Sequence, residues 1–315
     1  MSTQPSPHHL DVPGGSLYYE VRGSGPLLLV IAQPMTSAPF GPLADILAED
    51  HTVVTYDPHG LGASTIEDPS LDVTPEIEAD DLAYLIDAVG GERADVFGSS
   101  GGAVAALAFA ARHPDKAGAV IAHEPPVAEL LPDAPHVRIA VDDVEDAYRS
   151  YGSGAAWGKF VSLVMHDGPV TEAGVPPATW PPAGDGSEDG PTQDGEDLDG
   201  VEAPPEPEKQ QTDDELFFLR MLKPFTRYQP PVEVLRTGGP RVVVAVGADS
   251  RGEIARRSAE ALAERLGTPP AVFAGDHGGF MADPEAFAAT IRQVLTESRR
   301  NLELARHVSA RSESR

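Results

Sequence analysis

The chain has 315 residues, enough for one large domain or two smaller ones with a well-formed apolar core. Hydrophobic residues make up 41% of the chain and charged residues 23%, which excludes a fibrous or wholly disordered protein. The 23 lysines and arginines against 50 aspartates and glutamates give a net charge of −27, which repels phosphate backbones and anionic lipids. We therefore expect neither a nucleic acid nor a membrane as a partner.

Cysteine is absent, which excludes disulfides, thiolate metal sites and a thiol nucleophile. The first 15 residues lack the basic and then apolar profile of a secretory signal. The longest apolar runs, residues 27–32 and 103–111, are far too short to span a membrane. These observations predict a cytoplasmic protein.

Short apolar runs alternate with helical patterns over residues 1–125 and again over residues 240–298. In chain order, the patterns predict a strand at 16–22, a strand at 27–32, a helix at 40–48, a strand at 52–56, a helix at 75–89, a strand at 94–97, a helix at 103–112 and a strand at 117–122. The same rhythm returns with a strand at 241–246, a helix at 253–266, a strand at 270–273 and a helix at 284–297. Strands separated by helices indicate an α/β core with a mostly parallel sheet covered by helices on both faces.

Residues 126–239 interrupt this rhythm and are expected to form a helical cap, with helices at 141–165 and 213–228. Within them, residues 185–215 hold 13 acidic side chains against the single basic Lys209. Such a stretch buries too little apolar surface to offset the entropy of ordering it. We expect a disordered acidic insertion at about 182–214, and a charged C-terminal tail at 299–315.

The strongest local signal is the sequence Gly98-Ser99-Ser100-Gly101-Gly102, which matches G-x-S-x-G with Ser100 at its centre. It follows a predicted strand and begins a predicted helix. A tight turn between the two would expose the serine hydroxyl, and the glycines leave room for the neighbouring backbone. Ser100 is therefore the candidate nucleophile.

A serine hydroxyl needs a base to take its proton, and His277 directly follows the predicted strand 270–273. A solvated histidine in a surface turn is the alternative interpretation. A third group must orient the imidazole, and Asp249 stands at the end of the penultimate strand, although it could instead cap the following helix. Glu124, at the exit of the strand 117–122, is the alternative acid.

Two backbone N–H groups are expected to bind the oxyanion that forms during acyl transfer. One is that of Gly101, directly after the nucleophile at the start of a helix. The other is that of Gln33, the first residue beyond the strand 27–32, because Pro34 has no N–H. The sequence thus predicts an oxyanion hole formed by Gln33 and Gly101.

These motifs resemble the α/β-hydrolase superfamily over residues 10–298, apart from the acidic insertion. The sequence looks most similar to the group of cap-bearing esterases, lactonases and cofactor-free haloperoxidases. That resemblance implies hydrolysis without a metal or cofactor, through an acyl-serine intermediate. A serine at position 100, rather than an aspartate, argues against the haloalkane dehalogenases and epoxide hydrolases.

The expected function is a serine hydrolase that cleaves a carboxylic ester or lactone of a small to medium apolar substrate. Perhydrolysis by a haloperoxidase-like enzyme and binding by a non-catalytic member of the fold are the alternatives, and the oligomeric state is not indicated. The cap supplies apolar side chains that either line the pocket or form the core of the cap. They are Trp157, Phe160, Met165, Phe217, Phe218 and Met221.

Overall fold

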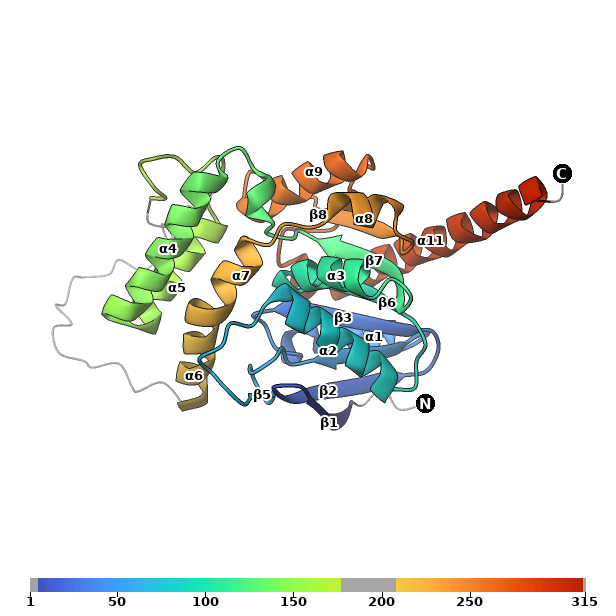
Figure 1. The fold of residues 1–315 in the computed structure, drawn as a ribbon, viewed down its shortest axis with the longest axis horizontal. Coiled ribbons are helices and arrows are strands. Elements are labelled where there is room, and N and C mark those ends of the chain that lie inside the picture. Colours follow the sequence, from blue (N-terminus) through green and yellow to red (C-terminus); the bar gives the residue numbers. More distant parts are fainter. Residues whose placement is uncertain (1–4, 177–207, 314–315) are drawn as a thin grey trace, which may run out of the picture.

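The computed structural model describes residues 5–176 and 208–313, with side chains described as far as residue 300. Most of the predicted acidic insertion, residues 182–207, lies outside the described residues. The described part confirms the predicted fold class, because helices cover both faces of a mostly parallel sheet (Figure 1).

The sheet of the described residues has nine strands. In chain order these are β1 (Ser6–Val12), β2 (Gly15–Gly23), β3 (Leu27–Gln33), β4 (Thr52–Tyr56), β5 (Thr65–Ile66), β6 (Ala94–Ser100), β7 (Ala117–His123), β8 (Val242–Gly247) and β9 (Ala271–Phe273). They lie side by side in the order β1-β2-β4-β3-β6-β7-β8-β9, with β5 paired to β2. The β3, β4 and β6 to β9 strands run parallel, so their carboxyl ends meet at one edge of the sheet, where open α/β sheets bind ligands.

Alternate residues of the central strands face opposite layers of helices. Leu29 and Ile31 of β3 pack in one buried cluster, whereas Leu28 and Val30 pack in the other. The first layer holds α2 (Pro75–Ala88), α3 (Gly101–Arg112), α8 (Val232–Thr237) and α9 (Ile254–Leu266). The second holds α1 (Gly41–Leu47) and α11 (Pro284–Glu313), with the short α10 (Gly279–Ala282) and the turn η1 (Ala38–Phe40) beside them.

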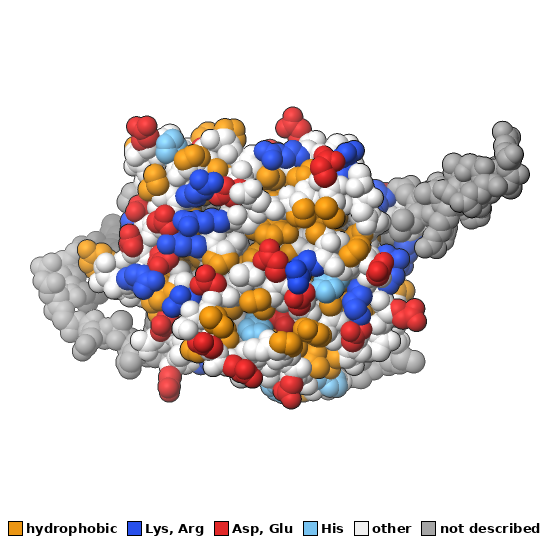
Figure 2. Space-filling model, in the orientation of Figure 1, with side chains coloured by type: hydrophobic (Ala, Val, Ile, Leu, Met, Phe, Trp, Pro, Cys, Tyr) orange, Lys and Arg blue, Asp and Glu red, His pale blue; other side chains and the backbone are white. Residues whose placement is uncertain are grey.

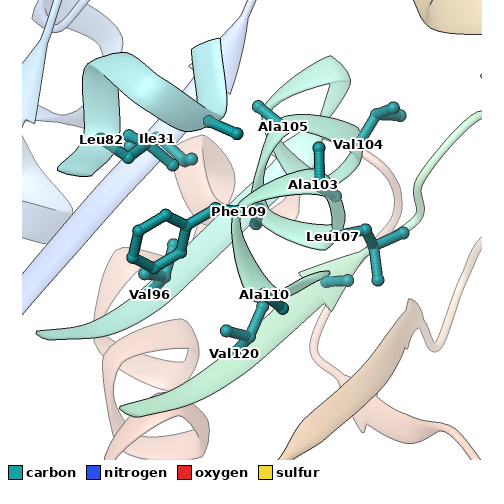
Figure 3. Close-up of a cluster of buried hydrophobic side chains, with 14 of the residues drawn as sticks. Ile31, Leu82, Val96, Ala103, Val104, Ala105, Leu107, Phe109, Ala110 and Val120 are labelled. Carbon is teal, nitrogen blue, oxygen red and sulfur yellow. The ribbon is translucent and has the colours of Figure 1, made fainter. Parts of the chain in front are cut away.

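Helix α3 packs closely against the middle of the sheet because its side chains are small. Every residue from Gly101 to Ala110 is buried, and most of them are alanine or glycine (Figure 3). At Gly102, an added Cβ would stand 2.5 Å from the Cα of Ala32 and 2.6 Å from the carbonyl oxygen of Ile31. This close approach brings the N-terminus of α3 against the carboxyl end of β3.

An insert of helices stands at one side of the sheet (Figure 1). It includes α4 (Ala134–Tyr151), α5 (Ser153–Val164), α6 (Glu208–Leu216), the π-helical turn η3 (Phe217–Met221) and α7 (Leu222–Thr226), after a short turn η2 (Ala128–Leu130). Instead of one helix at 141–165 there are two, because Gly152 adopts a φ of 82° and reverses the chain direction. Residues 208–214, which the composition assigned to the disordered insertion, form most of α6.

A partly buried ion pair joins this insert to the core. The guanidinium of Arg257, in α9, binds both carboxylate oxygens of Asp133, the residue before α4. The same carboxylate accepts a hydrogen bond of 2.8 Å from the backbone N–H of Val170. A two-pronged arginine–carboxylate pair fixes orientation as well as distance, so the start of α4 is held against α9.

Two further differences from the sequence predictions lie near the ends of the chain. Strand β1 was missed because its residues are polar and mostly exposed, and it is defined by antiparallel backbone pairing with β2. The predicted C-terminal tail continues α11 as far as Glu313, and this end of the helix projects from the body of the molecule (Figure 1).

The surface of the described part mixes both signs of charge. On the face shown in Figure 2, lysine and arginine side chains lie among aspartates and glutamates, and apolar side chains occur in small groups. Among the helices of the described residues, none combines the length and the apolar character that crossing a lipid bilayer demands.

The close approach at Gly102 predicts a large cost for adding a single methyl group. We expect Gly102→Ala to lower the free energy of unfolding by about 1–3 kcal/mol, because backbone atoms of β3 would have to shift. Gly158→Ala is the matched control, since this exposed position in α5 has nothing within 4 Å of an added Cβ. It should raise the free energy of unfolding by roughly 0.5–1 kcal/mol. Urea denaturation of both variants measures the difference, and equal effects would contradict the packing described.

Candidate active site

Ser100 lies at the sharp turn between β6 and α3. It is the last residue of the strand and the residue before the helix, and its backbone has a φ of 55° and a ψ of −125°. A positive φ is unfavourable for a serine and persists only where the surrounding structure enforces it. The G-x-S-x-G motif therefore occurs in the strand–turn–helix setting that a nucleophile elbow requires.

The glycines around Ser100 are required by close contacts with backbone atoms. An added Cβ at Gly98 would lie 2.5 Å from the carbonyl oxygen of Gly102, across the turn. One at Gly101 would lie 2.8 Å from the carbonyl oxygen of Gln33. The turn can thus close, and lie against β3, only without side chains at these positions.

Gln33 and Gly101, the two predicted oxyanion donors, lie next to each other. Gln33 ends β3 and is the register partner of Ser100 in the parallel pair of β3 and β6. Gly101 is the first residue of α3, where backbone N–H groups have no partner within the helix. Both residues line the same cavity as Ser100.

His277 lies in the loop after β9, and its ring is held by a buried carboxylate. The Nδ1 atom of His277 is 2.7 Å from Oε2 of Glu124, whose side chain is 1% exposed. Glu124 directly follows β7, and its other oxygen, Oε1, accepts a hydrogen bond of 2.9 Å from the backbone N–H of Gly247. A histidine held at Nδ1 in this way presents its Nε2 atom for proton transfer.

The surroundings of Glu124 keep its carboxyl group ionised. Burial alone would raise its pKa, but the hydrogen bond from His277 and the electrostatic interactions with the rings of His123 and His277 outweigh burial. Together with the N–H of Gly247 they lower the pKa of Glu124 to about 2. The carboxylate is therefore negative at any pH at which the protein would act.

Asp249, which the sequence analysis preferred as the partner of the imidazole, does not occupy that place. Its side chain is exposed at the end of the β8 strand, and its backbone N–H donates to the carbonyl oxygen of Gly275. In the described structure the carboxylate in contact with His277 is Glu124, the alternative acid. The preference for Asp249 failed because two neighbouring strands each end in a carboxylate, and only the path of the loops decides which one faces the histidine.

A cavity of about 330 Å³ lies between the carboxyl ends of the strands and the inserted helices. Ser100 and His277 both line it, together with Gln33 and Gly101. The rest of its wall is mainly aliphatic and aromatic, and its charged lining residues are Glu253 and Asp276. The cavity thus suits an apolar group without negative charge.

The apolar side chains predicted for the cap divide between the cavity wall and the cap core. Those that line the cavity are Phe160, Met165, Phe217 and Met221. Trp157 instead stacks against Phe217, with ring centroids 5.6 Å apart, and Phe218 is fully buried. The helical period identified the apolar face of the cap, but it could not show which part of that face meets the cavity.

A buried cluster of titratable groups behind Gln33 was not predicted. The Nε2 atom of Gln33 lies 3.4 Å from Oε1 of Glu78, which also accepts a hydrogen bond from the backbone N–H of His59. The hydroxyl of Tyr56 donates to the other oxygen of Glu78, and the ring of His59 contacts Asp81 at 2.9 Å. Glutamate and aspartate on the inward face of the predicted helix 75–89 were the available sequence signal.

The described residues include no cluster of three or more histidine and acidic side chains placed to hold a metal ion. The groups that the site itself presents are a hydroxyl, an imidazole with a buried carboxylate, and N–H groups at the start of a helix.

Comparisons with known proteins agree with this fold. The family model described as "alpha/beta hydrolase fold" matches residues 25–202, more than half of the chain, and the chain belongs to this family. An uncharacterized hydrolase of Bacillus subtilis, YraK, is 39% identical over 123 residues, which are 39% of this chain and 45% of that protein. The match thus spans less than half the length of this relative.

Solved structures with a similar fold include two with named activities. An esterase from Thermogutta terrifontis has a TM-score of 0.65 and 19% identity, with 94% of this chain and 99% of that chain covered. An enol-lactonase from Burkholderia xenovorans has a TM-score of 0.57 and 18% identity, with 92% and 100% covered. At this level of identity the likeness shows the fold.

The buried Glu78 predicts an unusual dependence of stability on pH. Burial and the charge of Asp81 raise the pKa of Glu78 to about 7, although Tyr56 and His59 act in the opposite direction. The folded protein then binds more protons than the unfolded chain between about pH 4.5 and pH 7. This contribution to stability is present below that window and is lost as the pH rises through it.

We expect Glu78→Gln to flatten this dependence. Between pH 5 and pH 8 the Tm of the parent should fall more steeply than that of the variant, because the amide cannot ionise. Glu76→Gln, on the same helix but not buried, serves as the control and should follow the parent. Parallel curves for all three proteins would show that Glu78 does not titrate in this range.

Proposed function

We propose that this protein is a serine hydrolase that cleaves a carboxylic ester or lactone of a small to medium apolar substrate through an acyl-serine intermediate. The observation that carries the proposal is the contact of 2.7 Å between His277 and the buried Glu124, beside a cavity that both His277 and Ser100 line. Structural neighbours that are an esterase and an enol-lactonase lend support at the level of fold.

In the first half of the reaction, Ser100 is the nucleophile and His277 the general base. The Nε2 atom of His277 takes the hydroxyl proton as the serine oxygen attacks the carbonyl carbon, and the carboxylate of Glu124 offsets the positive charge that develops on the ring. The carbonyl oxygen becomes an oxyanion, to which the backbone N–H groups of Gln33 and Gly101 donate. When the intermediate collapses, the alkoxide leaving group receives the proton from His277.

In the second half, water replaces the alcohol. His277 takes a proton from the water, whose oxygen attacks the acyl carbon, and the serine oxygen leaves with that proton. In a lactone the alcohol and the acid belong to one molecule, so the product is a hydroxy acid. Preorganised N–H donors stabilise charge that is present only in the transition state, and one such donor is typically worth roughly 2.7–4 kcal/mol.

The lining of the cavity supports the substrate class. Carboxylates at Glu253 and Asp276 repel a negatively charged acyl group, whereas Phe160, Phe217 and Val141 offer apolar contact. An uncharged substrate with a hydrocarbon part fits this wall best.

Replacing the nucleophile tests the reaction directly. We expect Ser100→Ala to reduce kcat for p-nitrophenyl esters by at least about 1000-fold, because no other hydroxyl replaces the serine. Its Tm should not fall, since alanine is no larger than serine and this side chain is only half-buried. A fluorophosphonate should label Ser100 in the parent and leave the variant unlabelled. A parent that is neither labelled nor active on an acyl-length panel would instead identify a non-catalytic binding protein.

A second pair of variants tests which acid orients the histidine. We expect Glu124→Gln to lower kcat by about 10²–10⁴-fold, since an amide cannot offset the charge on the imidazole ring. Asp249→Asn, at the exposed carboxylate of the neighbouring strand, should stay within about twofold of the parent. Steady-state kinetics at pH 8 measures both. A larger loss of kcat in Asp249→Asn than in Glu124→Gln would show that Asp249, and not Glu124, orients the histidine.

A further inference from the structure

A buried hydrogen bond joins the ends of the two strands that carry the proposed nucleophile and acid. The Oγ atom of Ser99 lies 3.1 Å from Nδ1 of His123, and both residues are fully buried. Ser99 and His123 are also register partners in the parallel pair of β6 and β7. The side-chain contact therefore adds a cross-link at the last paired position of these strands.

Each partner of this bond directly precedes a residue with a strained backbone. Ser100 has a φ of 55° and Glu124 a φ of 47°, and these are the only residues other than glycine with positive φ in the described structure. Such conformations persist only where the surrounding structure enforces them. The buried hydrogen bond between Ser99 and His123 therefore fixes the backbone directly before Ser100 and directly before Glu124.

The ring of His123 also faces the third member of the proposed triad. Its centroid is 6.2 Å from that of His277, with an angle of 25° between the planes. On its other sides it packs against Phe273 and Phe287, with centroids 5.7 Å and 5.3 Å away. The side chain of His123 thus faces the ring of His277 and hydrogen-bonds to Ser99, the neighbour of Ser100. His123 also directly precedes Glu124 in the chain.

A histidine at this place has one ring nitrogen that lowers stability. Its Nε2 atom is buried and has no hydrogen-bond partner among the described residues. A polar atom that loses its water without gaining a partner destabilises the folded state. A phenylalanine would fill the same cage of aromatic rings without an unpartnered nitrogen, but it would leave the buried hydroxyl of Ser99 without this partner, so the histidine is explained by its bond to Ser99 and not by packing.

Burial also keeps His123 uncharged. It lowers the pKa of His123 to about 4, with His277 acting in the same direction and the carboxylates of Glu124 and Asp276 in the opposite one. A neutral ring beside His277 does not repel the imidazolium that forms during proton transfer.

We propose that Ser99 and His123 are positioning residues for the reaction: their hydrogen bond sets where Ser100 and Glu124 stand, and the His123 ring sets the plane of His277. The inference rests on the proposed function. Ser99 and His123 are fully buried and absent from the wall of the cavity, so they act on the rate of the chemical step and not on substrate binding.

The first test removes the hydroxyl. We expect Ser99→Ala to lower kcat by about tenfold or more with KM within about twofold of the parent, because small displacements of reacting groups are costly. Ser298→Ala is the matched control, since Ser298 is also fully buried and its hydroxyl bonds only within α11, to the carbonyl oxygen of Val294. The control should keep the kcat of the parent. Equal kcat values for the two variants, or a change confined to KM, would overturn the proposal.

The second test separates the polar role of His123 from its packing. His123→Phe keeps an aromatic ring and should lower kcat by about tenfold or more with little change in Tm, because removal of the unpartnered Nε2 offsets the lost hydrogen bond to Ser99. His123→Asn places an amide atom near the position of Nδ1 and should recover most of the lost kcat. If the phenylalanine variant is fully active, or if kcat in both variants simply follows the loss of Tm, His123 is structural and the proposal fails.

A spectroscopic readout distinguishes failure of this inference from failure of the proposed function. The Nδ1 proton of His277, held by Glu124, should give a downfield proton resonance in the parent that is absent in Glu124→Gln. We expect it to shift in Ser99→Ala and His123→Phe and to stay in place in Ser298→Ala. If the resonance shifts in these two variants but no fluorophosphonate labels the parent, Ser99 and His123 do position His277, and the proposed hydrolase function is wrong. If the parent is labelled but resonance and kcat are the same in the parent and in these variants, only the positioning role of Ser99 and His123 is wrong.

Discussion

The hydrogen bond between His277 and Glu124 is the interaction on which the site depends. It joins the exit of the β7 strand to the loop after β9, which are separated by 153 positions in the chain and brought together only by the sheet. Removing a carboxylate from water is unfavourable, and here the imidazole and a backbone N–H compensate for it. A charge held in this way is fixed in position, so in the proposed mechanism it can offset the positive charge that develops on the imidazole ring.

Close packing between a helix and the sheet positions Ser100, Gly101 and Gln33. The helix α3 approaches the sheet closely because glycine and alanine line its inner side, and this approach places the start of the helix beside the end of the β3 strand. Gly101 and Gln33 become neighbours as a result. The strained backbone at Ser100 and Glu124 is therefore stabilised by packing around it and not by local preference.

Patterns within a few residues predicted the part of the site that is local. The turn at Ser100 needs glycines on both sides, and these glycines stand next to it in the sequence, so the turn could be predicted. The choice between Glu124 and Asp249 could not, because both follow buried strands and the difference lies in how distant loops fold over the sheet. The β1 strand was not predicted because it is defined by backbone pairing with β2, and its mostly exposed residues show no apolar pattern.

The carboxylates of Glu253 and Asp276 in the cavity wall bear on how the proposed cycle ends. Hydrolysis converts an uncharged reactant into an acid that is ionised at neutral pH. The cavity accepts the uncharged reactant, but its two carboxylates repel the ionised product. The described lining residues include no lysine or arginine that could bind the product anion. Repulsion by these carboxylates therefore weakens binding of the acid product, which speeds its release and limits product inhibition.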